Sequence, residues 1–126
     1  MKRLPILALA FCLPATLAAE TVASEPLPAT LELHYRLRYN GLVIGHVTKT
    51  LTREADSRYR HRSHSRPEGM ARLFTTVEWY EEGRFEIVKG EVRPLEFLEY
   101  RVGADKPHRH SATFDWKSLK IQYAHG

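Results

Sequence analysis

Residues 31–39, LELHYRLRY, alternate without interruption between two kinds of side chain. Leucine or tyrosine occupies every odd position, and a charged residue or histidine occupies every even one. Successive side chains of a β-strand point to opposite faces, so this alternation predicts a strand with one buried face. Asn40-Gly41 follows at once, a dipeptide that tolerates the positive φ of a two-residue hairpin turn. A second strand, antiparallel to the first, is therefore expected over residues 42–52, where Gly45 marks a bulge or a close approach of another segment.

The rest of the chain continues with short strands separated by turn residues. Ser65, Pro67 and Glu68 have the order of a helix N-terminus, with Ser65 as the N-cap, and Pro94 fits best at the start of a strand. The pattern predicts a mainly β domain, an antiparallel meander that forms a curved open sheet or partial barrel with one short helix. The expected segments are a turn at 54–57, strands at 58–65, 75–88 and 95–102, a helix at 67–74, and a last hairpin at 110–116 and 119–124.

The first 19 residues have the layout of a secretory signal peptide. Lys2 and Arg3 precede an apolar run at residues 4–13 that is too short to span a bilayer, and small residues follow it. The single cysteine, Cys12, lies inside that run and too early for a lipoprotein. We therefore expect a periplasmic protein that is not an integral membrane protein, with an extended lead-in at residues 20–30 and one domain at residues 31–126.

Charge argues against a nucleic-acid partner. The whole chain has a formal net charge of +4, and removal of Lys2 and Arg3 with the signal peptide lowers it to about +2. A surplus this small, in an exported protein, predicts no nucleic-acid binding.

RYRHRSHSR, residues 58–66, is the most unusual stretch. In a strand, Arg58, Arg60 and Arg62 share one face, and His61 and His64 point to opposite faces. One metal ion cannot easily take both histidines. The arginine row is then either a solvated outer face or an anion-facing patch.

No catalytic residue and no cofactor are expected. The sequence lacks the common motifs of nucleophile elbows, zinc proteases and phosphate-binding loops. His108 and His110 would share a face of a strand, but a zinc site needs three or four protein ligands, so surface histidines and no metal are the expectation. An enzyme is therefore less expected than a binding protein or an assembly module, and a nucleic-acid binder is less expected still.

Four segments resemble a family of bacterial exported proteins known as domain of unknown function 3108. They are YNGLVIG at 39–45, GMARLF at 69–74, RFEIVKGEVRPLEF at 84–97 and ATFDW at 112–116. The resemblance spans residues 31–123 and implies no catalytic residue, because the activity of that family is not established. Its members are usually longer, which implies that this chain is a short or C-terminally incomplete member with an open sheet edge at residues 120–124.

Two classes of function remain from the sequence. The first is non-enzymatic binding of an apolar or lipid-like ligand in envelope maintenance. The second is an envelope interaction or assembly module that pairs with another protein, or with itself, through an exposed strand edge. The aromatic residues form either a filled core or the lining of an apolar groove. For the ligand-binding class the expected site residues are Arg58, Arg60, Arg62, Trp79, Phe85, Phe97, Tyr100 and Trp116.

Overall fold

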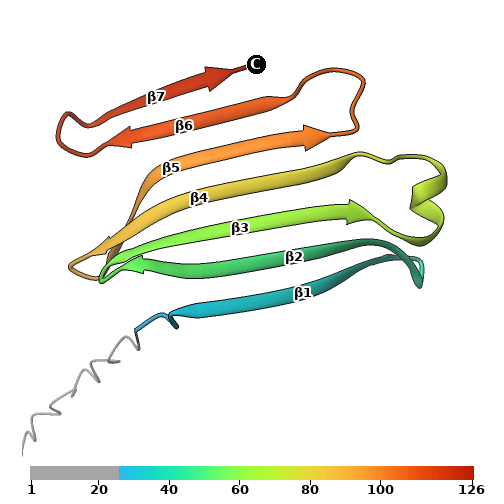
Figure 1. Ribbon diagram of the computed structural model, residues 1–126, viewed down its shortest axis with the longest axis horizontal. Coiled ribbons are helices and arrows are strands. Elements are labelled where there is room, and N and C mark those ends of the chain that lie inside the picture. Colours follow the sequence, from blue (N-terminus) through green and yellow to red (C-terminus); the bar gives the residue numbers. More distant parts are fainter. Residues whose placement is uncertain (1–25) are drawn as a thin grey trace, which may run out of the picture.

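The computed structural model describes residues 26–126, and the predicted signal peptide lies outside the described residues. Seven antiparallel strands form one open sheet in which each strand pairs with the next along the chain (Figure 1). The predicted mainly β meander is therefore confirmed. The strands are β1 (Thr30–Tyr39), β2 (Leu42–Ala55), β3 (Arg58–Pro67), β4 (Glu78–Val88), β5 (Glu91–Val102), β6 (Arg109–Asp115) and β7 (Lys120–His125).

Two hairpin turns have positive φ at both central residues, as predicted for Asn40-Gly41. Asn40 and Gly41, between β1 and β2, have φ values of 47° and 81°. Lys89 and Gly90, between β4 and β5, have φ values of 53° and 81°. Positive φ at both central residues matches the right-handed twist of the paired strands, so each turn holds its hairpin in register.

The predicted helix is present only as a 3-10 helix, η1 (Gly69–Leu73). The expectation that Ser65 caps it is wrong, because Ser65 lies inside β3, paired with Val47. The residue before the helix is Glu68, whose backbone N–H donates to the carbonyl of Ile44 at 3.0 Å, so η1 is fastened to the start of β2. Pairing of β3 continues to Pro67 and thus delays the helix start.

Register shifts bend the sheet at three places. One falls between Leu37 and Arg38 on β1, beside Gly45, where a Cβ would meet the Arg66 carbonyl oxygen at 3.2 Å. A second interrupts the β2–β3 pairing near Ala55. A third falls opposite Pro94, which sits within β5 at this irregularity rather than at the strand start expected from sequence. Proline lacks a backbone donor, so a bulge accommodates it inside a strand.

No second layer covers either face of the sheet within the described residues. Among the hydrophobic residues there, only Val47 and Tyr59 are buried, at 8% and 3% exposure. The Tyr59 ring stacks on Phe85 with centroids 5.4 Å apart, and the Arg53 guanidinium lies 5.5 Å from it. The apolar side chains that a globular domain would bury in a core are therefore available at the surface.

Candidate functional site

The pairing register divides the side chains between two chemically different faces. One face, named here the apolar face, carries a hydrophobic band across all seven strands. The opposite face, named the ion-pair face, carries the even-numbered residues of β1, β3 and β4. The apolar face is formed by Leu31, Leu33, Tyr35, Leu37, Val47, Leu51, Tyr59, Trp79, Phe85, Phe97, Phe114, Ile121 and Tyr123.

The sheet separates the residues predicted to form one ligand site. Arg58, Arg60 and Arg62 lie on the ion-pair face, opposite Glu86, Arg84 and Glu82 of β4. Trp79, Phe85 and Phe97 lie on the apolar face. An arginine head-group contact and these three aromatic rings therefore cannot surround the same small ligand within one sheet.

Of the two further predicted residues, Tyr100 is on the ion-pair face, stacked on Tyr80 with ring centroids 5.0 Å apart. It lines a hollow of about 380 Å³ there together with Arg62, so the structure brings these two predicted residues together. Trp116 follows β6, where its indole N–H donates to the Pro94 carbonyl oxygen at 2.7 Å and the Arg93 guanidinium lies 5.3 Å from its ring. Through these contacts, Trp116 connects the β6–β7 turn to β5.

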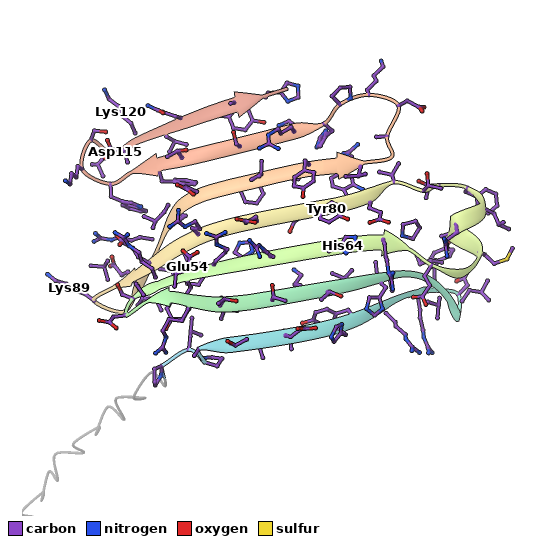
Figure 2. The ribbon with its side chains drawn as sticks, in the orientation of Figure 1. Glu54, His64, Tyr80, Lys89, Asp115 and Lys120 are labelled. Atoms are coloured by element: carbon purple, nitrogen blue, oxygen red, sulfur yellow. The ribbon has the colours of Figure 1, made fainter. Side chains whose placement is uncertain are left out.

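The arginine row is neutralised by glutamates. Arg60 donates to Glu54 at 2.6 Å and to Glu82 at 3.0 Å, and Arg62 donates to Glu82 at 2.9 Å. Arg84 donates to the other oxygen of Glu54 at 3.0 Å (Figure 2 labels Glu54). Burial opposes ionisation of Glu54, but hydrogen bonds from Arg84 and Arg60 outweigh that effect and lower its pKa. The row therefore has little unpaired positive charge for an external anion.

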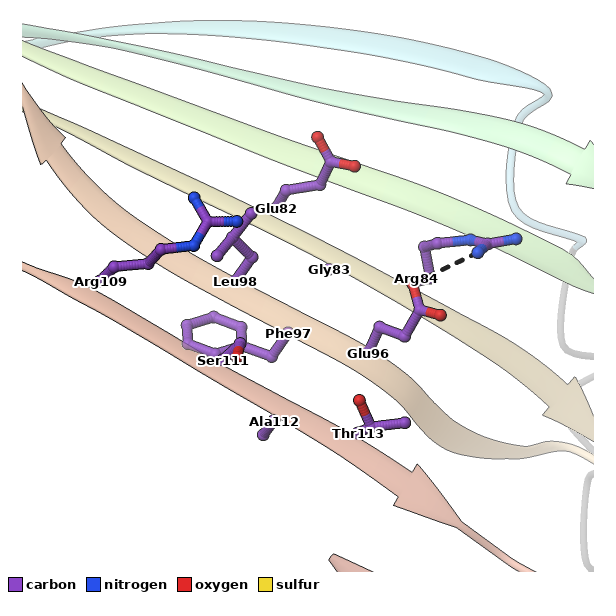
Figure 3. Close-up of a pocket in the computed structure, with 10 residues that line it drawn as sticks. All are labelled: Glu82, Gly83, Arg84, Glu96, Phe97, Leu98, Arg109, Ser111, Ala112 and Thr113. Carbon is purple, nitrogen blue, oxygen red and sulfur yellow. Dashed lines mark hydrogen bonds and ion pairs between the residues drawn. The ribbon is translucent and has the colours of Figure 1, made fainter. Parts of the chain in front are cut away.

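A hollow of about 200 Å³ lies further along the same face, over β4, β5 and β6 (Figure 3). The Arg84–Glu96 pair, 3.3 Å apart, borders it, and Arg109 lines it as well. Glu82, Leu98, Ser111 and Thr113 line it from the ion-pair face, and Phe97 and Ala112 border it as well. Its walls therefore combine charged, hydroxyl and apolar side chains.

His64, Tyr80 and Tyr100 form a stack of rings on the ion-pair face, and Glu78 bonds the first two. This arrangement was not predicted from the sequence. His64 lies against Tyr80 with ring centroids 4.3 Å apart, and both side chains bond the same oxygen of Glu78, at 2.6 and 2.9 Å (Figure 2). The bond to His64, followed by the bond from Tyr80, lowers the Glu78 pKa, and Glu78 in turn raises the Tyr80 pKa. Alternation places these residues on one face, but only the register brings His64 opposite Tyr80.

The apolar face is hollowed over β1, β2 and β3. A depression of about 300 Å³ is lined by Leu31, Leu33 and Leu51, with Lys49 and His61 beside them. A second depression of about 150 Å³ lies at the β6–β7 turn, lined mainly by Phe114, Trp116, Leu119 and Ile121. Charged side chains border both depressions as well: Lys49, Arg62 and Glu81 at the first, and Lys120 and Asp115 at the second.

Histidines also gather on the apolar face where β5, β6 and β7 meet. His108 bonds Glu99 at 2.8 Å, and its ring centroid lies 4.3 Å from that of His110. His110 also contacts the Tyr123 hydroxyl and faces His125. Burial, followed by the neighbouring His108 and His125, lowers the His110 pKa.

Comparisons with known proteins identify no relative. No family model matches the chain, and neither a curated protein nor a solved structure matches it. The resemblance to domain of unknown function 3108 stays a prediction. Within residues 26–126, no helix is long and apolar enough to cross a membrane. In the same residues, no group of three or more histidine, cysteine, aspartate or glutamate side chains is arranged to hold a metal ion.

Proposed function

We propose that this is a non-enzymatic periplasmic protein that binds an apolar or lipid-like ligand on the apolar face, in envelope maintenance. The observation that carries the proposal is the hydrophobic band left uncovered by the single-layer sheet. Leu33 and Leu37 remain 38% and 47% exposed, and Ile121 at the other end of the band remains 66% exposed. An apolar sheet face needs a cover, and a bound hydrocarbon chain would remove this surface from water.

Lys49 is the proposed partner of an anionic head group. It lies on the apolar face between Leu33 on β1 and Ser63 on β3, and it lines the 300 Å³ depression. The arginine row lies on the other face and is engaged by Glu54 and Glu82. Lysine presents a compact charge on a flexible stem, which can follow a mobile head group at the edge of a hydrocarbon surface.

A titration of delipidated protein with a fluorescent fatty acid tests the proposal. The double variant Leu33→Ser/Leu37→Ser removes apolar contact from β1, and we expect its Kd to rise roughly tenfold, equivalent to about 1.4 kcal/mol. The matched control is Glu32→Ser/Arg36→Ser on the opposite face of the same strand, which should leave Kd unchanged. Equal effects of the two double variants would refute binding on the apolar face.

The second candidate is an assembly module, and the unpaired strand edges favour it. β1 and β7 are the outermost strands of the sheet, so each presents an edge that a strand of another molecule could extend. Arg109 and Gly126 exchange both backbone hydrogen bonds, so by alternation the N–H of Ile121 points away from β6.

Ile121→Pro removes that outward donor, whereas Ile121→Ala keeps it and also shortens the side chain. Dissociation of an oligomer by Ile121→Pro but not by Ile121→Ala, measured by analytical ultracentrifugation, would support the assembly module. A monomer that binds fatty acid would favour ligand binding instead.

A further inference from the structure

Three of the seven histidines lie at one corner of the sheet. His108 is in the loop between β5 and β6, His110 is on β6, and His125 ends β7. The marked C-terminal end of β7 lies on the same side of the sheet as that loop (Figure 1). The antiparallel hairpin thus joins histidines that are 15 residues apart in sequence.

The β6–β7 register places the side chains of His110 and His125 directly opposite each other. They are direct partners across β6 and β7. The neighbouring pair, Arg109 and Gly126, exchanges two backbone hydrogen bonds of 2.8 and 2.9 Å. Hydrogen-bonded and non-hydrogen-bonded pairs alternate along an antiparallel ladder, so His110 and His125 form a non-hydrogen-bonded pair, the kind with the closer side chains. Their Nδ1 atoms are 3.1 Å apart.

That separation matches a metal chelate. Nitrogen ligands lie about 2.0–2.1 Å from Zn²⁺, so two nitrogens 3.1 Å apart would subtend roughly 100° at the ion. This angle lies between the octahedral and tetrahedral values.

We propose that His110 and His125 bind one divalent transition-metal ion, of the Zn²⁺ and Cu²⁺ class, through their Nδ1 atoms. Imidazole nitrogen is a preferred ligand for this class. Within residues 26–126 no group of three such side chains is arranged around one ion, so the site has fewer protein ligands than a structural or catalytic zinc site, and water fills the remaining coordination positions. The Tyr123 hydroxyl, which contacts His110 Nδ1, must move aside.

His108 and Glu99 support the site without ligating the ion. The Glu99 carboxylate engages His108 Nε2, and the His108 ring packs edge-on against His110. This contact restricts the His110 ring, and the Glu99 carboxylate offsets the positive charge of the neighbouring Arg101. The proposed metal site does not depend on lipid binding.

Isothermal titration with Zn²⁺, together with native mass spectrometry of tag-free chelator-treated protein, tests the site. We expect one Zn²⁺ per chain and at least a tenfold loss of affinity in His110→Gln and in His125→Gln. The control is His61→Gln, which removes a histidine of the same face that lies over Gly83, away from the cluster. It should bind Zn²⁺ like the wild type.

Tyr123→Phe gives an independent readout, because it removes the competing hydroxyl and keeps the ring. We expect this variant to bind Zn²⁺ at least as tightly as the wild type, and Cu²⁺ bound to wild type to show electron paramagnetic resonance coupling to two imidazole nitrogens. Absence of stoichiometric Zn²⁺ binding, or binding that His110→Gln and His125→Gln leave intact, would overturn the proposal. Circular dichroism of each variant confirms that the sheet is formed.

Discussion

Arg62 on β3 and Trp79 on β4 lie on adjacent strands but on opposite faces of the sheet. Arg62 is paired with Glu82, whereas Trp79 is paired with Ser65. The spacing between Arg62 and Ser65 along β3 is odd, so their side chains point to opposite faces. The aromatic rings and the Arg62 guanidinium, which binds Glu82, therefore lie on different faces, although Arg62 also borders the depression over β1, β2 and β3. The head-group partner that we propose on the apolar face is Lys49.

Lys49→Gln and Arg58→Gln separate the two faces in a binding assay. Lys49→Gln should raise the Kd for a fatty-acid anion several-fold, because it removes the cation beside the hydrocarbon depression. Arg58→Gln should leave Kd unchanged, since that side chain lies beside Glu86 on the other face, with Nε and Oε2 3.8 Å apart. Fluorescence titration at low ionic strength measures both. The reverse order of effects would place the head group on the ion-pair face.

Tyr59 is the main buried anchor of the described sheet. Tyr59→Ala removes a ring that is 3% exposed and stacked on Phe85, and we expect it to lower the free energy of unfolding by about 3 kcal/mol in urea denaturation. Tyr59→Phe keeps the ring and should cost less than about 1.5 kcal/mol. A Tyr59→Ala effect no larger than that of Tyr59→Phe would mean that this residue is not a packing centre.

Gly69 and Gly41 distinguish a steric clash from backbone strain. Both have positive φ, 59° and 81°, but a Cβ at Gly69 would lie 2.7 Å from the Val43 carbonyl oxygen, whereas nothing lies within 4 Å at Gly41. We expect Gly41→Ala to cost about 1 kcal/mol from strain alone. Gly69→Ala should cost more, about 3 kcal/mol, because η1 must move away from β2. Thermal unfolding of both variants measures the difference, and equal costs would contradict the close contact of η1 with β2.

Acid should weaken the fold partly through Glu54. Its pKa is lowered in the folded protein from an ordinary value of 4.5, so its contribution to stability is complete above pH 4.5 and is lost as the pH falls through the lower folded value. Glu54→Gln should therefore be less stable than the wild type at pH 7, and this difference should narrow below pH 4.5.

Urea unfolding at several pH values between 7 and 3 measures the effect. Glu91→Gln, a substitution at the start of β5, is the control and should track the wild type throughout. A stability difference between Glu54→Gln and the wild type that stays constant with pH would contradict the Arg60–Glu54–Arg84 network.

The strands and tight turns were predictable because they depend on local sequence. The alternation of residues 31–39 and the Asn40-Gly41 dipeptide each predict backbone geometry without knowledge of a partner. The separation of Phe97 from Tyr100 was also within reach, since an odd spacing in one strand reverses the side-chain direction. Grouping the aromatic residues by type concealed this separation.

Contacts between strands could not be predicted in the same way. Glu54 reaches both Arg60 and Arg84 because a register shift near Ala55 displaces it toward β3 and β4. His125 meets His110 because the β6–β7 register makes them partners. The helix prediction failed at its cap for a related reason: β3 pairing extends through Ser65. Register depends on many cross-strand contacts at once, so it cannot be predicted from a short sequence motif.

Native mass spectrometry of the purified protein, followed by organic extraction, decides whether the apolar face holds a lipid-like ligand. We expect a stoichiometric lipid-like molecule that is lost from the Leu33→Ser/Leu37→Ser variant and retained by the Glu32→Ser/Arg36→Ser control. A bare wild-type protein that also fails to take up fatty acid after purification would contradict it.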